Sequence, residues 1–119
     1  MYKILLAIPT FNESENVISL HKVIRKYNKK INILFIDDNS NDGTINKIKK
    51  IINIDKKTFL VVREKKLGIG SAHKFAFKWA YKKRFKFLIT MDADFSHDPK
   101  IINKIIKIKH KFHVVQTNR

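Results

Sequence analysis

Short apolar runs alternate along the chain with longer segments in which apolar residues recur every three or four positions. Runs rich in Ile, Leu, Phe and Val predict buried β-strands, and the recurring spacing predicts amphipathic helices. The predicted strands are Lys3 to Ile8, Ile31 to Ile36, Thr58 to Val62, Phe85 to Met91 and Phe112 to Val115. The predicted helices carry Val17, Leu20, Ile24 and Tyr27; Ile45, Ile48 and Ile52; Ala72, Phe75, Ala76, Trp79 and Ala80; and Ile101, Ile102, Ile105 and Ile106.

Strands that alternate with helices in this way predict an α/β fold, a Rossmann-like three-layer sandwich with a mostly parallel sheet of about five strands and helices on both faces. At 119 residues the chain is expected to form one domain. Crossover connections place the carboxyl ends of parallel strands at one edge of the sheet. Ligands of open α/β sheets bind outside that edge.

The acidic residues are clustered at the ends of the predicted strands. Eight of the ten fall into three short segments: Glu13 and Glu15; Asp37, Asp38 and Asp42; and Asp92, Asp94 and Asp98. The predicted topology brings Glu13, Asp38, Asp92 and Asp94 into one cleft. For Asp37 and Asp42, a ligand-binding role and a role as helix cap or solvated loop residue remain equally open.

The most informative stretch runs from Leu88 to Pro99, where a buried strand ends at Met91 and two carboxylates follow at Asp92 and Asp94. Carboxylates at positions i and i+2 of a loop can converge on a hard cation such as Mg²⁺ or Mn²⁺, which keeps positions open for phosphate oxygens. Asp98 is then predicted to be the N-cap of a helix with Pro99 at its first position. Earlier in the chain, Asn12 or Ser14 and Asp42 or Thr44 are candidate helix caps.

Charge and composition exclude several classes of protein. There is no cysteine, hence no disulfide framework or thiolate metal site, and no apolar stretch approaches the length of a membrane span. The net charge of +16 rests on Lys rather than Arg, so the composition favours attraction to anionic lipid or phosphorylated substrates over nucleic acid. We expect a cytoplasmic protein, with peripheral contact with the cytoplasmic face of a membrane left open.

Other ligand-binding motifs fit poorly. The segment Gly68-Ile-Gly70-Ser71 lacks the third glycine of a dinucleotide fingerprint and follows the third predicted strand, so a tight turn that lets a helix approach the sheet is the simpler reading. A Walker loop is absent, and a receiver domain would carry paired aspartates after its first strand rather than its second. The five histidines have no ligand spacing, although His97 lies near enough to the acidic loop to contact a phosphate.

Four motifs taken together resemble the family-2 glycosyltransferases, closest to the dolichol-phosphate (polyprenyl-phosphate) mannosyltransferase group. They are Ile8-Pro-Thr-Phe-Asn-Glu13, Ile36-Asp-Asp-Asn-Ser-Asn-Asp-Gly-Thr44, Lys66-Leu-Gly-Ile-Gly-Ser-Ala72 and Met91-Asp-Ala-Asp-Phe-Ser-His-Asp-Pro99. The chain departs from the family pattern at Phe11, where tyrosine is commoner, at Asn39, where glycine is frequent, and at His73, where an aromatic is usual. Asn at position 39 tolerates a left-handed backbone.

The resemblance implies that residues 1–119 are the nucleotide-sugar-binding part of a GT-A glycosyltransferase domain, with a nucleotide-sugar donor (GDP-mannose), a polyprenyl or dolichyl phosphate acceptor and Mg²⁺ or Mn²⁺. It implies that Pro9, Phe11 and Glu13 line the nucleoside pocket and that Asp38 bonds the base. Lys66 and Gly68 belong to the same donor site. Asp92 would lie near ribose and metal, Asp94 and Ser96 would complete the metal ligands, and Arg119 would face phosphate beside the catalytic Asp92 and Asp94.

In this reading the anionic lipid phosphate is the nucleophile, so no strong general base is needed and direct displacement inverts the anomeric centre. Family catalytic domains continue past the point matched by Arg119 and supply the acceptor side. We therefore expect donor and metal binding to persist, with transfer feeble or dependent on a partner chain. The alternatives are a non-catalytic nucleotide-sugar-binding or interaction module and a basic nucleic-acid or membrane-surface protein.

Overall fold

A computed structural model describes residues 4–65, 67–107 and 114–116. Lys66 and Arg119, both expected at the donor site, lie outside the described residues. The strands are β1 (Ile4–Thr10), β2 (Asn32–Asp37), β3 (Thr58–Val62), β4 (Phe87–Thr90) and β5 (Val114–Gln116). The helices are α1 (Val17–Tyr27), α2 (Thr44–Ile54), α3 (Ile69–Lys82) and α4 (Ile101–Lys107).

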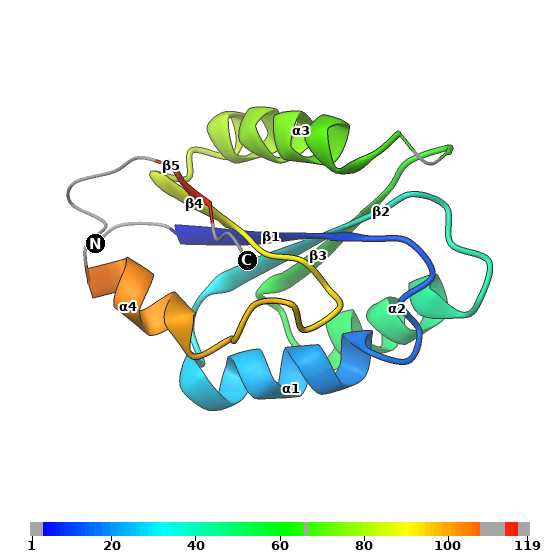
Figure 1. Ribbon diagram of the computed structural model, residues 1–119, viewed down its shortest axis with the longest axis horizontal. Coiled ribbons are helices and arrows are strands. Elements are labelled where there is room, and N and C mark those ends of the chain that lie inside the picture. The colour runs from blue at the N-terminus through cyan, green and yellow to red at the C-terminus, as the bar shows by residue number, and fades with distance from the viewer. Residues whose placement is uncertain (1–3, 66, 108–113, 117–119) are drawn as a thin grey trace.

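The strands form one parallel sheet in the order β3-β2-β1-β4-β5 (Figure 1). The chain therefore builds outwards from β1 in one direction through β2 and β3, and in the other through β4 and β5. This reversal of strand order lies beside β1. The observed sheet confirms the prediction of an α/β fold with about five mostly parallel strands. Ligands of such sheets bind at the carboxyl ends of the strands that flank the reversal.

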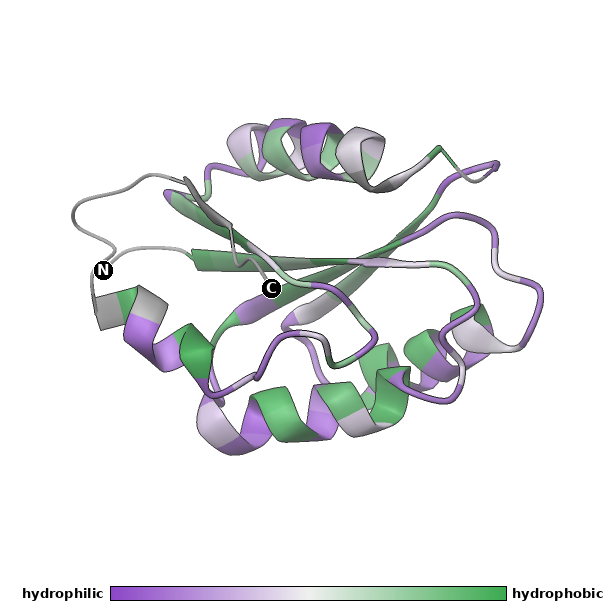
Figure 2. Cartoon of the chain, in the orientation of Figure 1, coloured by the Kyte–Doolittle hydropathy of each residue, from purple (hydrophilic) through white to green (hydrophobic). Residues whose placement is uncertain are grey.

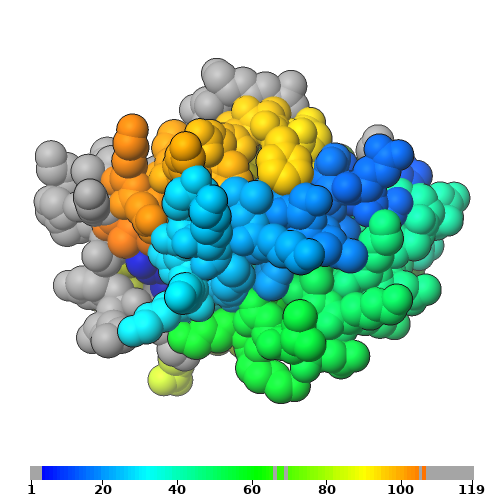
Figure 3. All heavy atoms as spheres, turned by 90° about the horizontal axis from the view of Figure 1, so that it is seen from below, coloured from blue at the N-terminus to red at the C-terminus, as the bar shows by residue number. Residues whose placement is uncertain are grey.

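Helices cover the two faces of the sheet unequally: α1, α2 and α4 lie on one face and α3 lies on the other (Figure 1). Because side chains alternate along a strand, Leu6, Ile8 and Phe35 face the three helices, whereas Leu5 and Leu34 face α3. The residues of β1, β2 and β4 are mostly apolar and buried, and apolar and polar residues alternate along the described helices (Figure 2). The view from the three-helix face shows α1, in blue to cyan, beside the orange α4 (Figure 3).

The strand predicted to end before Pro9 continues to Thr10. Met91 N–H donates to Ala7 O, and Asp38 N–H donates to Thr10 O. The backbone N–H and C=O groups of odd-numbered residues of β1 therefore point toward β4, and those of even-numbered residues point toward β2. The pairing with β4 ends at Ala7. The missing N–H of Pro9 therefore falls beyond that ladder and costs no hydrogen bond.

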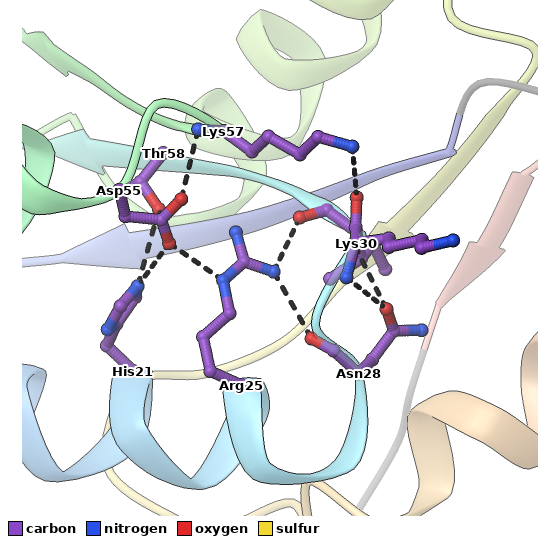
Figure 4. Close-up of polar contacts among 8 residues, drawn as sticks. His21, Arg25, Asn28, Lys30, Asp55, Lys57 and Thr58 are labelled. Atoms are coloured by element: carbon purple, nitrogen blue, oxygen red, sulfur yellow. Dashed lines mark hydrogen bonds and ion pairs between the residues drawn. The ribbon is translucent and has the colours of Figure 1, made fainter.

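A cluster of hydrogen-bonded polar side chains lies at the edge of the sheet where the strands begin (Figure 4). Asp55, just after α2, accepts a hydrogen bond from Arg25 Nε at 2.7 Å, and its Oδ2 lies 2.7 Å from His21 Nε2. Thr58 Oγ1 also donates to Asp55, and Arg25 Nη1 donates to Ile31 O. Burial opposes ionisation of Asp55, but the hydrogen bonds from Arg25 and His21 outweigh it and hold the pKa of this carboxyl well below its usual value. The cluster thus ties α1 to the connection between α2 and β3.

Of the five candidate helix caps, Asn12, Ser14 and Thr44 are wrong, and Asp42 and Asp98 need adjustment. The first helix begins at Val17, after Asn16. The backbone N–H groups of Asn12 and Ser14 instead donate to Ser40 Oγ and Asp42 Oδ2 in the loop after β2. Gly43 occupies the cap position of α2 with φ 97°, while Asp42 accepts the Thr44 N–H. Asp98 accepts the Lys100 N–H at 3.0 Å, but α4 begins only at Ile101. Among the described helices, none is long and apolar enough to cross a membrane.

Candidate functional site

Three loops meet at the carboxyl edge of the sheet beside β1. The first loop (residues 11–16) follows β1, the second loop (residues 38–43) follows β2, and the acidic loop (residues 92–98) follows β4. Since β2 and β4 are the two neighbours of β1, their ends lie two strand spacings apart, roughly 10 Å. In the view from the three-helix face, the acidic loop, in yellow, lies beside the blue segment that contains the first loop (Figure 3). The structure therefore places Asp38 and the Asp92–Asp94 loop at one edge.

Asp37 is a structural residue of this edge. Its side chain is fully buried and accepts hydrogen bonds from Thr10 Oγ1, Ser40 N and Ser40 Oγ at 2.6–2.7 Å. A carboxylate with three short hydrogen bonds is well compensated for burial. Asp37 therefore fixes the second loop against the end of β1.

Asp42 links the first and second loops. Its carboxylate accepts hydrogen bonds from Ser14 N at 3.2 Å and from the backbone and hydroxyl of Thr44. The Thr44 hydroxyl in turn accepts the Glu13 N–H at 2.9 Å. Slight burial opposes ionisation, yet these hydrogen bonds, led by the Thr44 hydroxyl, lower the pKa of Asp42 from 3.8 to about 2. Asp37 and Asp42, whose roles the sequence left open, thus both hold loop structure together.

Acid is expected to weaken the fold mainly between about pH 4 and pH 2, as Asp42 and Asp55 take up protons. Both pKa values are depressed in the folded protein, so the stabilisation is fully present above the unfolded value near 3.8 and is lost as the pH falls toward the folded one. Urea unfolding at a series of pH values measures this slope. Asp42→Asn should flatten part of it, while Glu15→Gln, an exposed change of equal charge, should leave it unaltered. Equal profiles for the two variants would contradict the assignment.

Asp38 forms a buried ion pair with Arg63, the residue directly after β3. Arg63 Nε lies 2.6 Å from Asp38 Oδ1 and Arg63 Nη2 lies 2.8 Å from Oδ2, which is a bidentate arrangement. The two side chains are 9% and 8% exposed. Leu67 N donates to Asp38 Oδ2, and Arg63 Nη1 donates to Ser71 Oγ at 2.9 Å. The pair therefore connects the ends of β2 and β3 to the first turn of α3.

Gly68 makes the turn into α3 with φ 89°, a left-handed backbone that glycine adopts without strain. A Cβ placed on Gly68 or Gly70 would meet no atom within 4 Å. The turn is therefore explained by the backbone conformation of Gly68, and neither glycine is needed to make room for a neighbouring atom. Asn39 has φ 60°, which confirms that Asn supplies a left-handed residue where glycine is frequent in the family.

The acidic loop is folded on itself by hydrogen bonds. Ser96 N donates to Asp94 Oδ1 at 3.0 Å, and Ser96 Oγ donates to Asp92 Oδ2 at 3.3 Å. Asp94 is exposed, and Phe95 has φ 62°. Within the described part of the chain, no three of the residues Asp, Glu and His gather as a ready-made metal site. The donor set is two carboxylates and a hydroxyl in one short loop, which fits a cation whose remaining ligands come from phosphate oxygens.

His97 shapes the acidic loop from within. Its side chain is buried, and Nδ1 accepts the Asp92 N–H at 3.3 Å. The other ring nitrogen, Nε2, is buried and has no hydrogen-bond partner among the described residues. The sequence suggested phosphate contact for His97; the structure assigns it a role in fixing the backbone of Asp92.

The remaining predicted donor-site residues lie at the same edge. Pro9 is half-buried near the end of β1, and Phe11 is 38% exposed at the start of the first loop. Glu13 accepts a hydrogen bond from Asn16 Nδ2 at 3.0 Å, which supports the entry to α1. Arg63 and Ser71 were missed by the sequence analysis, although the position of Arg63 directly after a predicted strand was a usable signal.

The sequence and the fold match known glycosyltransferases. The family model "Glycosyl transferase family 2" matches residues 6–119, so the chain belongs to that family. Polyprenol monophosphomannose synthase of Mycolicibacterium smegmatis is 31% identical over 103 residues, which are 86% of this chain and 39% of that protein. Dolichol-phosphate mannosyltransferase of Saccharomyces cerevisiae is 30% identical over 82 residues, 69% of this chain and 30% of that protein.

Two solved structures share the fold, which is of the GT-A type. S. aureus TarS in complex with UDP superposes with a TM-score of 0.74 at 19% identity, over 93% of this chain and 33% of that one. The mannosyltransferase PcManGT from Pyrobaculum calidifontis, in complex with GDP-Man and Mn²⁺, gives a TM-score of 0.60 at 21% identity, over 67% of this chain and 25% of that one. The chain thus spans well under half the length of the relatives that it matches.

Proposed function

We propose that this glycosyltransferase chain binds GDP-mannose together with Mg²⁺ or Mn²⁺ and takes part in inverting transfer of mannose to a polyprenyl phosphate. The observation that carries the proposal is the edge beside β1, where Asp38 and the Asp92–Asp94 loop lie on either side of one strand end. Support for the sugar and the acceptor comes from relatives named as mannosyltransferases of polyprenol and dolichol phosphates.

The Asp38–Arg63 pair suits a base-binding role. Asp38 Oδ2 already accepts two hydrogen bonds, from Arg63 and Leu67, whereas Oδ1 accepts one. A carboxylate oxygen has two lone pairs, so Oδ1 keeps one free for a donor N–H of the base. Arg63 holds the carboxylate in a fixed orientation. Phe11 follows Thr10, which pairs with Asp37, and its exposed ring is suited to stacking.

The acidic loop suits the diphosphate end of the donor. Asp92, Asp94 and Ser96 would hold the divalent cation, and His97 keeps the Asp92 backbone in place. A bound cation supplies neutralisation of the charge that builds on the departing diphosphate. The acceptor phosphate is already anionic at neutral pH, so the chain needs no general base. Attack from the face opposite the diphosphate inverts the anomeric carbon.

The sharpest test is calorimetric titration of the chain with GDP-mannose, with Mn²⁺ present and absent. We expect binding that requires Mn²⁺ and is at least ~10-fold weaker for UDP-glucose, because the base contacts differ. No heat with any donor would overturn the proposal. Transfer is measured separately, with radiolabelled GDP-mannose and polyprenyl phosphate in vesicles. Donor binding without labelled lipid would favour the second candidate, a donor-binding module that needs a partner chain for transfer.

A further inference from the structure

The outward face of α3 carries aromatic and basic side chains in one stripe. Lys74, Phe77, Lys78, Tyr81 and Lys82 follow one another at spacings of three, one, three and one, which place them on one side of a helix. Phe77 is 53% exposed and Tyr81 is 78% exposed. The opposite side of the helix carries the small buried residues Ala72, Ala76 and Ala80, which pack on the sheet. The stripe therefore plays no part in the core.

A groove extends this stripe toward β4. It has a volume of about 260 Å³ and is lined by Phe77, Ala80, Tyr81, Phe85, Lys86, Phe87 and Leu88. Basic side chains surround its outer end, where Lys82, Arg84 and Lys86 lie around Tyr81 and Phe85. The surface is thus apolar at its centre and cationic at its rim, and it lies on the face of the sheet that only α3 covers among the described helices (Figure 1).

The charge around α3 has one sign. No Asp or Glu occurs between Glu64 and Asp92, whereas this interval contains the basic residues Lys65, Lys66, Lys74, Lys78, Lys82, Lys83, Arg84 and Lys86. In contrast, α1 and α2 are flanked by acidic residues such as Glu15 and Asp55. Lys83 Nζ lies 5.7 Å from the ring centre of Trp79, so a cation also covers the aromatic residue next to the stripe.

We propose that this α3 face, defined by Lys74, Phe77, Lys78, Tyr81 and Lys82 with the adjoining groove, binds the surface of an anionic lipid bilayer. A helix with aromatic and basic residues on one exposed side lies at the headgroup level, with its rings in the interface and its cations near anionic headgroups. The alkyl stems of the lysines add apolar contact while their ammonium groups stay in water. Lysine outnumbers arginine here, which favours lipid over nucleic acid, since nucleic-acid recognition relies on Arg.

The position of α3 connects this surface to the donor-binding edge. The helix begins just after Gly68, where Leu67 N binds Asp38, and runs roughly 21 Å away from that edge. A bilayer along α3 would therefore lie close to the donor site without covering the three loops. The inference adds a membrane contact to the proposed function, and it rests on the geometry and charge of α3 alone.

The test is binding to vesicles of phosphatidylcholine with and without 30% phosphatidylglycerol, followed by flotation. We expect binding to the anionic vesicles only. Lys74→Gln/Lys78→Gln/Lys82→Gln should weaken it at least ~10-fold, and Phe77→Ser/Tyr81→Ser at least ~5-fold. The matched controls are Lys49→Gln/Lys50→Gln/Lys56→Gln, which removes the same charge from exposed positions on and beside α2, and Ile54→Ser, which removes an apolar side chain that is 84% exposed. Equal losses in test and control variants would overturn the proposal.

Trp79, the single tryptophan of the chain, lies on α3 and packs against Phe59 and Phe85, so an unchanged Trp79 emission in the α3 variants shows that they remain folded. Binding of mixed-sequence RNA that is lost in the α3 variants to the same extent would assign the surface to nucleic acid and overturn the proposal. GDP-mannose titration of Phe77→Ser/Tyr81→Ser should match the wild type, which keeps failure at the membrane distinct from failure at the donor site.

Discussion

Replacing Arg63 with methionine is expected to lower the free energy of unfolding by about 3–5 kcal/mol. The substitution keeps most of the apolar stem but removes the guanidinium that holds both oxygens of Asp38. Because the Asp38 side chain is only 8% exposed, its carboxylate would be left buried with Leu67 N as its remaining hydrogen-bond donor. Urea unfolding followed by Trp79 fluorescence measures the loss.

A double variant separates the ion pair from the packing of its members. Asp38→Asn/Arg63→Met removes both charges, so it should be more stable than Arg63→Met alone. If the double variant instead shows the sum of the two single losses, the pair is not coupled and the fixed orientation of Asp38 has another cause. The double variant should still bind donor poorly, because a neutral amide cannot replace the carboxylate at the base.

The elements of this fold were predictable from sequence because its central strands β1, β2 and β4 are buried on both faces. The run Ile31 to Ile36 is apolar at every position except Asn32, as parallel sheets between helix layers require. The stripe Ala72, Ala76 and Ala80 likewise marked the inward side of α3 correctly. The residues at which the strands end were harder to predict from sequence. Pro9 can continue β1 because the hydrogen bonding of β1 with β4 stops at Ala7.

The roles of neighbouring carboxylates were not predictable from sequence. Asp37 and Asp38 are adjacent, and alternation along a strand end sends them in different directions. Which one remains available to a ligand depends on partners distant in sequence: Thr10 for Asp37 and Arg63 for Asp38. The pairing of β2 with both β1 and β3 brings these partners together. The hydrophobic pattern of each segment does not predict this strand order.

The same limit applies to His97. A histidine in an acidic loop suggests ligand contact, yet the buried ring accepts the Asp92 N–H. Phe95, at φ 62°, reverses the backbone between the two acidic residues and the histidine and permits this contact. A non-glycine residue in that conformation has no reliable local signal.

Replacing Asp94 with alanine is expected to weaken GDP-mannose binding in the presence of Mn²⁺ on the order of 100-fold, because it removes one of two carboxylates proposed to hold the cation against the diphosphate. Asp94 is exposed, so stability should change by less than about 0.5 kcal/mol and the effect on binding can be measured in folded protein. Asp98→Ala is the matched control: it removes the same charge from an exposed residue of the same loop, whose carboxylate bonds only to the Lys100 N–H among the hydrogen bonds described. The decisive comparison is made without Mn²⁺, where wild type and Asp94→Ala should converge to the same weak affinity. A difference that persists without the metal would mean that Asp94 contacts the donor directly, and no difference with the metal would remove Asp94 from the site.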